Sequence, residues 1–389
     1  MLAGFWRGLR LGLRVGSGGL IGGIGVLLTF AVFASLGGVG WVVPGLAGRV
    51  GVMGEDFGGL ADVELAAYVD AERLGCGPSV RELGVVEVRR RQAVRVAGRV
   101  AGPGLAEVRD VEVGRRSVSG AALGGLTGVD ASLVASVGVA SVRGRLYRPT
   151  LDAVPLVVYL HGGMWSIGGL ESHDRLCRRL AVAARVAVLA VDYRLAPEHP
   201  WPAGIDDAVA AFRWAAEHAG QLCGAVGVPA VAGDSSGGHL AALVCLRMRD
   251  AGGPMPAAQF LAFPNTDLTL SRPSTRDKAT GWGLTTDAVA WGVENLVPDP
   301  VRRADPGVSP LFAPDPAGLP PAVVVTAEHD PLRDEGDEYA DRLRGAGVRV
   351  RHRRELGMVH GFLTMELVSP AADAAGGRYF ADVADFLSG

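Results

Sequence analysis

Gly233-Asp234-Ser235-Ser236-Gly237 is the stretch that decides the fold of this chain. The apolar run Pro229–Ala232 before it predicts a strand, and leucines at helical spacing after it predict a helix. A Gly-x-Ser-x-Gly turn between a strand and a helix presents its serine as a nucleophile, because the turn leaves room only for small neighbours. The chain has 57 glycines, so an ordinary glycine-rich turn is the alternative for these five residues taken alone.

A second glycine motif lies upstream, where the apolar run Val154–Leu160 ends at His161-Gly162-Gly163-Met164-Trp165. Consecutive residues with little side chain let backbone N–H groups turn towards one point. Such donors stabilise the oxyanion that develops in acyl transfer, and each is worth roughly 100- to 1000-fold in rate. Upstream of a nucleophilic serine, this motif predicts an oxyanion hole rather than a simple glycine turn.

Acidic residues follow a further strand pattern, Pro321–Ala327, and three of them compete to orient a catalytic base: Glu328, Asp330 and Asp334. Active sites of α/β proteins collect their residues just past the carboxyl ends of strands. We select Asp330, because the proline after it ends the strand and leaves this residue at the tip of the loop. A solvated loop carboxylate is the alternative for each of the three.

His360 lies between Gly357 and Gly361, after the strand pattern Val348–Arg351. Most lone histidines are structural, and we expect this of His199, His239 and His352. His360 differs because it completes the order serine, acid, histidine that α/β-hydrolases share. We therefore expect its imidazole to take the serine proton while the acid orients the ring.

From about residue 143 to the C-terminus, the chain resembles the hormone-sensitive-lipase branch of the α/β-hydrolase fold, which contains bacterial carboxylesterases. The resemblance is carried by HGGMW at 161–165, VDYRLAPE at 191–198, GDSSGG at 233–238, DPLRD at 330–334 and GMVHGF at 357–362. It implies Ser235 as the nucleophile, Asp330 as the orienting acid and His360 as the base. It also implies a mostly parallel sheet flanked by helices, with an N-terminal helical cap over the acyl pocket.

Met164 and Ser236 depart from the family pattern, which has a third glycine and usually an alanine at these positions. In the family the oxyanion donors are backbone amides, here those of Gly163, Met164 and Ser236, while Gly162 shapes the loop. Neither departure therefore removes a donor. Met164 does restrict φ and places a flexible apolar side chain near the acyl pocket, which bears on the size of the acyl group. The VDYRLAPE stretch is expected to support the oxyanion loop.

The sequence divides into an apolar segment at 1–52, a cap and lead-in region at 53–140, and a catalytic domain at 141–389. Alternating strand and helix patterns in the last part predict a mostly parallel sheet covered on both faces. Partly helical patterns at 61–96 predict the cap. Residues 266–296 add aromatic side chains that either contribute to the cap or pack against the sheet.

No charged side chain lies between Arg14 and Arg49, and arginines precede this run. An uncharged stretch of more than about 20 residues can span a bilayer, and the arginine bias places the N-terminus inside. Residues 15–46 are thus a candidate membrane anchor. A signal peptide cleaved near Val32–Ser35 and a mis-assigned start before Met53 are the alternatives, giving an exported or a cytoplasmic protein.

Composition excludes several classes of function. The formal net charge of −3 argues against nucleic-acid partners. The four cysteines lack C-x-x-C spacing, so we expect no metal site; they are Cys76, Cys177, Cys223 and Cys245. We expect Cys177 and Cys245 to be buried helical thiols. No phosphate-binding loop or dinucleotide fingerprint follows a strand, so no cofactor is expected.

Together these patterns predict a serine carboxylesterase that cleaves small esters of short to medium acyl chains through an acyl-enzyme on Ser235. The same machinery can act on an N-acetyl amide or an acetylated sugar, so a deacetylase or amidase is the alternative within catalysis. A ligand-binding protein on a hydrolase scaffold is disfavoured, because receptors resembling this family lose the histidine and His360 is present. A membrane-tethered structural protein is also disfavoured, because such a protein would not need the serine, acid and histidine in this order. The oligomeric state is left open.

Overall fold

The computed structural model describes residues 62–74, 78–98, 100–114 and 141–388. They belong to one compact unit, Gly45–Gly389. No helix within these ranges is long and apolar enough to cross a membrane. The candidate anchor at 15–46, the signal-peptide site, the start at Met53 and Cys76 lie outside the described residues.

An eight-stranded sheet forms the centre of the unit, in the order β1-β2-β4-β3-β5-β6-β7-β8. Its strands are β1 (Glu107–Val113), β2 (Val142–Arg148), β3 (Leu156–Leu160), β4 (Ala187–Val191), β5 (Ala230–Asp234), β6 (Gln259–Ala262), β7 (Ala322–His329) and β8 (Val350–Val359). The β1–β2 and β2–β4 pairs are antiparallel, and the other neighbours are parallel. The predicted mostly parallel sheet is confirmed.

The sheet begins one strand earlier than the pattern from residue 141 predicts, because β1 pairs with β2 along its whole length. This strand reads Glu-Val-Arg-Asp-Val-Glu-Val and lies at the edge of the sheet, with most of its residues partly or fully exposed. Charged side chains are common on edge strands, since they discourage pairing with other chains. Such a strand looks like a loop in the sequence.

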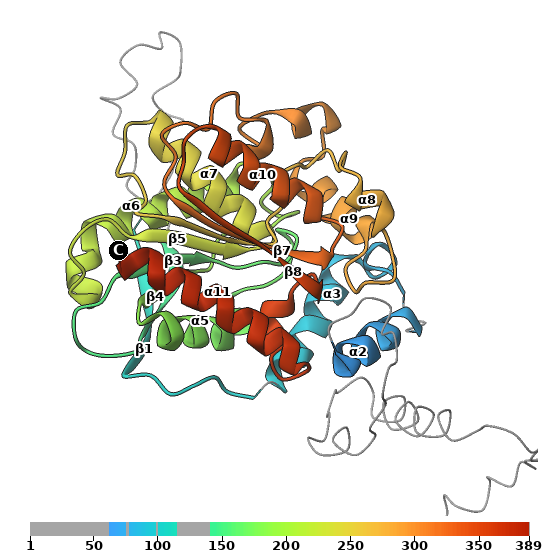
Figure 1. Cartoon of the computed structure of the whole chain (residues 1–389), viewed down its shortest axis with the longest axis horizontal. Helices are drawn as coiled ribbons and strands as arrows, with labels where there is room; N and C mark the ends of the chain where they lie inside the picture. The colour runs from blue at the N-terminus through green and yellow to red at the C-terminus, as the bar shows by residue number, and fades with distance from the viewer. Residues whose placement is uncertain (1–61, 75–77, 99, 115–140, 389) are drawn as a thin grey trace, which may run out of the picture. The chain divides into compact units, whose positions relative to one another are not determined.

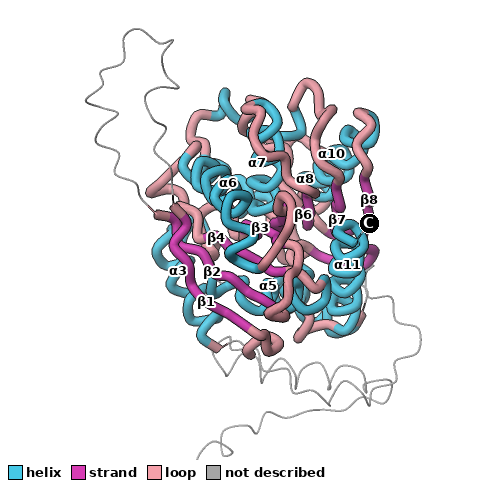
Figure 2. Tube along the Cα trace, turned by 90° about the vertical axis from the view of Figure 1, so that its left-hand side faces the viewer, coloured by secondary structure: helices cyan, strands magenta, loops and turns pink. Residues whose placement is uncertain are grey.

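Two helical layers enclose the sheet, and Figures 1 and 2 show them on its opposite faces. One layer contains α6 (Ala203–Cys223), α7 (Ser236–Asp250) and α10 (Arg333–Gly345), and the other contains α5 (Leu170–Ala184) and α11 (Pro370–Ser388). Alternate residues of β3 enter different cores: Val158 packs with the first layer, and Val157 packs with the second. All of β3 is buried, as expected for a parallel strand covered on both faces.

A further group of helices lies beyond the end of the sheet where β7 and β8 terminate (Figure 1). They are α2 (Val63–Leu74), α3 (Val80–Ala97), α8 (Ser274–Asp277) and α9 (Thr286–Leu296); three short 3-10 helices span Pro300–Ala304, Pro310–Phe312 and Phe362–Thr364. A reciprocal capping box starts α3, in which Ser79 and Glu82 each accept the other's backbone N–H. Of the helical patterns predicted at 61–96, those at 63–74 and 80–96 are confirmed as helices.

The elbow between β5 and α7 leaves no space for a side chain at Gly237, where an added Cβ would lie 2.0 Å from the Leu160 carbonyl oxygen. We expect Gly237→Ala to lower the free energy of unfolding by about 3 kcal/mol, because a backbone atom of the central sheet cannot move aside. Gly377 in α11 is the matched control, since nothing lies within 4 Å of its added Cβ. Gly377→Ala should raise stability by about 0.5–1 kcal/mol. Thermal unfolding of both variants measures these changes, and equal melting temperatures would contradict the tight elbow.

Candidate active site

Ser235 lies at the junction of β5 and α7 with φ 55° and ψ −123°, outside the regions that most residues adopt. Its backbone is held on both sides: the Ser235 amide donates to the Ala262 carbonyl at 2.8 Å, and its carbonyl accepts from the His239 amide at 3.0 Å. A strained residue persists only where its surroundings fix it in this way. The predicted strand–turn–helix context of the serine is confirmed.

Three side chains from separate segments form a continuous chain of contacts. His360 Nε2 lies 3.0 Å from Ser235 Oγ, and His360 Nδ1 lies 2.8 Å from Asp330 Oδ2. Asp330 is fully buried, and its other oxygen accepts the Leu332 amide. Because a carboxylate only accepts, Nδ1 carries the imidazole proton and Nε2 is free to accept the serine proton. This is the geometry of a nucleophile, its base and the group that orients the base.

The two competing acids have other partners. Glu328 accepts the Gly357 amide at 2.7 Å, and Asp334 accepts the Ser274 amide at 2.8 Å. Neither contacts His360 in the described part of the chain. Asp330 differs because it is the first residue after β7. Of the three acids, Asp330 is thus the one that the structure places beside His360.

The candidate oxyanion loop, residues 161–168 and called the oxyanion loop below, makes a tight turn after β3. The Gly163 carbonyl accepts two amides, from Ser166 at 3.1 Å and from Ile167 at 2.9 Å. Gly163 has φ 130°, and an added Cβ would lie 2.2 Å from the Ile167 carbonyl oxygen, so only glycine fits. Within the described residues, no hydrogen-bond acceptor faces the amides of Gly163 and Met164. They remain available to an oxyanion, as does the amide of Ser236 in the first turn of α7.

Met164 takes φ 52°, a left-handed conformation that a glycine would adopt at no cost. Helix α9 packs directly on it: an added Cβ at Gly292 would lie 2.7 Å from Met164 Cβ. The backbone of Met164 is therefore held in a conformation that favours glycine, and the packing of helix α9 against Met164 limits its movement.

The carboxylate of Asp234 holds the start of the oxyanion loop in place. Its carboxylate accepts the Gly162 amide at 3.1 Å and the Tyr159 hydroxyl at 2.6 Å, and it faces His173 Nε2 at 3.3 Å. Burial alone would raise the pKa of Asp234, but the charge of His173 and the hydrogen bonds from His173 and Tyr159 hold the pKa at about 2. The Gly162 amide is therefore occupied, and Gly162 shapes the loop without donating to an oxyanion. Sequence reasoning missed Tyr159 and His173, which carry no recognisable motif.

Tyr193 supports the same loop, as the sequence predicts. Its hydroxyl donates to the His161 carbonyl at 2.7 Å, and its ring stacks on the His161 ring with centroids 4.3 Å apart. Burial, with the nearby charge of His173, lowers the pKa of His161 to about 3, so the ring is neutral at physiological pH. Of the histidines expected to be structural, His239 bridges Trp165 Nε1 and the Val308 carbonyl.

The chain's only lysine, Lys278, lies beside the residue that precedes Asp330. Its Nζ is 3.1 Å from His329 Nδ1 and 4.6 Å from the centre of the Trp282 ring. Trp282 and His329 stack with their ring centroids 4.0 Å apart. Of the aromatic residues at 266–296, Trp282 thus packs on the end of β7, and Trp291 is buried in α9.

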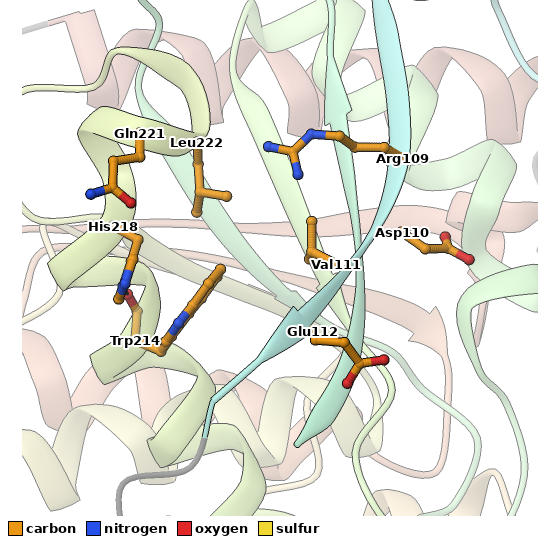
Figure 3. Close-up of a pocket in the computed structure, with 8 residues that line it drawn as sticks. All are labelled: Arg109, Asp110, Val111, Glu112, Trp214, His218, Gln221 and Leu222. Carbon is orange, nitrogen blue, oxygen red and sulfur yellow. Dashed lines mark hydrogen bonds between the residues drawn. The ribbon is translucent and has the colours of Figure 1, made fainter.

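A hollow of about 380 Å³ lies away from these residues, between β1 and α6 (Figure 3). It is lined by Arg109, Asp110, Val111, Glu112, Trp214, His218, Gln221 and Leu222. None of the triad or loop residues borders it, so we place no chemistry there. The described cysteines, Cys177, Cys223 and Cys245, are free and buried, which agrees with the expectation for Cys177 and Cys245.

Comparison with known proteins places the chain among hydrolases. A family model described as the alpha/beta hydrolase fold matches residues 157–364. Carboxylesterase NlhH of Mycobacterium tuberculosis is 47% identical over 247 residues, covering 62% of this chain and 77% of that protein. Ethyl acetate hydrolase of Pseudomonas putida is 39% identical over 236 residues, covering 59% of this chain and 74% of that protein. The crystal structure of an α/β-hydrolase enzyme from the metagenome of Lake Arreo, Spain, is similar with a TM-score of 0.74 and 36% identity, over 85% of this chain and 100% of that one.

Proposed function

Because the chain belongs to the hormone-sensitive-lipase-like branch of the α/β-hydrolase family, we propose that it is a carboxylesterase that uses Ser235 as its nucleophile. The observation that carries this proposal is the contact chain from Ser235 through His360 to the buried Asp330. Relatives at 47% and 39% identity are named as a carboxylesterase and an ethyl acetate hydrolase. Both names support ester hydrolysis by this chain.

In the proposed reaction, Ser235 Oγ attacks the ester carbonyl while His360 Nε2 takes its proton. The amides of Gly163, Met164 and Ser236 donate to the oxyanion of the tetrahedral intermediate. His360 then protonates the leaving alcohol, which leaves an acyl-enzyme on Ser235. Water repeats the two steps and releases the acid. Asp330 holds the imidazole in the required tautomer and stabilises its charged form.

We propose short to medium acyl groups as substrates. The Met164 side chain and the close packing of Gly292 against it support this choice, since both fill space that a third glycine would leave open. We also propose residues 1–52 as a separate apolar segment and α2 and α3 as the cap within 53–140. The catalytic part extends beyond the expected 141–389, because its sheet includes β1. Membrane association through 15–46 stays a prediction from the sequence.

Hydrolysis of p-nitrophenyl acetate, butyrate, octanoate and palmitate by the full chain tests the ester and its length, and p-nitroacetanilide tests the amide alternative. We expect kcat/KM to fall from butyrate to palmitate and the anilide to be at least about 100-fold slower, because its leaving group is poorer. Met164→Gly is the matched variant, and it should raise kcat/KM for octanoate relative to acetate. Faster cleavage of the anilide would favour an amidase, and ligand binding without turnover would favour a binding protein.

A further inference from the structure

Helix α3 of the cap reaches the oxyanion loop through two polar side chains. Arg89 Nε donates to the Ser166 carbonyl at 2.7 Å, and Gln92 Oε1 accepts the Gly168 amide at 2.9 Å. Ser166 is fully buried, so its carbonyl needs a protein partner when the cap is in place. The two contacts fall on the part of the turn that follows the candidate oxyanion donors Gly163 and Met164.

Arg89 also joins the oxyanion loop to the stretch 191–198, which supports that loop. Its Nη2 donates to the Ala196 carbonyl at 2.9 Å, while the Ala196 amide donates to the Trp165 carbonyl at 2.9 Å. Glu198 closes the group with a bidentate pair to the guanidinium, at 2.8 and 2.9 Å. One planar guanidinium therefore fixes two backbone segments and has its charge matched, which a lysine could not do.

The other arginines of α3 make no such contact among the described residues. Arg81 pairs with Asp287 and Glu294 of α9, and Arg90 pairs with Glu87 on its own helix. These pairs are largely exposed, and exposed ion pairs contribute about 0–1 kcal/mol to stability. Arg89 and Gln92 are thus distinguished from their neighbours by what they touch.

We propose that Arg89 and Gln92 are positioning residues that hold the oxyanion loop in its catalytic shape. The inference rests on the proposed esterase function, and it makes the activity depend on α3 being seated on residues 166–168. With the cap helix in place, the turn is bonded on both sides and the Gly163 and Met164 amides stay where an oxyanion forms. Without these bonds the turn is free to shift, and misplacement by about 1 Å can cost about 100-fold in rate.

Kinetics of Arg89→Met and Gln92→Leu, both in the full chain, test the positioning role. We expect kcat for p-nitrophenyl butyrate to fall by about 10- to 100-fold, with KM changed by less than about threefold, because the lost stabilisation belongs to the transition state. Binding of a trifluoromethyl ketone, which forms a tetrahedral adduct with the serine, should weaken in parallel. Arg90→Met is the matched control on the same helix, and Gln92→Glu should keep activity because its carboxylate still accepts the Gly168 amide. A change in KM alone, or equal losses in Arg90→Met, would overturn the proposal.

Hydrogen exchange followed by mass spectrometry tests the same proposal without measuring catalysis. Peptides covering 161–168 should exchange faster in Arg89→Met than in the wild type, and Arg90→Met should match the wild type. If the wild type cleaves no ester, the proposed function fails, and this exchange measurement still decides whether α3 holds the loop. Unchanged exchange in Arg89→Met would overturn the inference while leaving the esterase proposal intact.

Discussion

Replacement of Ser235 by alanine is expected to lower kcat by about 10⁴- to 10⁶-fold, because the acyl-enzyme then has no oxygen on which to form. The change removes a single atom from a residue whose strained backbone is held by bonds to Ala262 and His239, so the fold should remain. Initial rates with p-nitrophenyl butyrate measure the loss. Melting temperature and circular dichroism show that the variant is folded.

Ser236→Ala is the control for this experiment, since Ser236 is the next residue and contributes only its amide to the proposed chemistry. Its buried hydroxyl has no hydrogen-bond partner within the described residues, so its loss should leave kcat within about threefold of the wild type. Labelling by an organophosphonate should occur at Ser235 in the wild type and be absent in Ser235→Ala. Turnover above about one per cent in Ser235→Ala would exclude this serine as the nucleophile.

Asp330→Asn is expected to lower kcat by about 10⁴-fold at neutral pH. An asparagine can turn its amide group towards His360 Nδ1 and donate to it, which moves the imidazole proton to Nε2. That nitrogen lies 3.0 Å from Ser235 Oγ and could then no longer accept the serine proton. The size of the expected loss in kcat therefore reflects the change of tautomer at His360 as well as the lost negative charge of Asp330. Single-turnover kinetics with p-nitrophenyl acetate separate the acylation step.

The competing acids are the natural controls for Asp330→Asn. Glu328→Gln and Asp334→Asn keep side chains of the same size and leave the contact between Asp330 and His360 in place. Each should retain kcat within about tenfold. A loss in Asp334→Asn as large as that in Asp330→Asn would show that the orienting acid has been misassigned.

The parts of the site that the sequence predicts are those carried by short, continuous signals. Ser235 follows an apolar run and precedes a helical pattern, and both neighbours of the turn must be small; this information lies within a few residues. Asp330 and His360 each follow a strand pattern, and the order of the three residues along the chain completes the prediction. The sequence predicts the ends of these strands less accurately. The pattern Pro321–Ala327 stops short of the end of β7 at His329, and the pattern Val348–Arg351 covers only the start of β8, which spans Val350–Val359.

The parts that the sequence does not predict depend on contacts between distant segments. Arg89 meets Ser166 from 77 positions away, and nothing in the run of arginines on α3 separates it from Arg90. His173 faces Asp234 from 61 positions away, and a single histidine in an amphipathic helix resembles any other. Strand β1 was missed because its charged residues suit an edge, and edges are recognised only once the strand order is known.

The stack of Lys278 on Trp282 and His329 has a practical consequence for handling the protein. Lys278 is the only side-chain amine in a chain of 389 residues, so amine-directed dyes and supports can react there and at the chain's amino terminus. A dye on Lys278 would sit next to the residue that precedes Asp330, where it would sense events at the end of β7. Molecules coupled to an activated bead through this side-chain amine would all be held by the same edge, with the Asp330 side turned towards the bead.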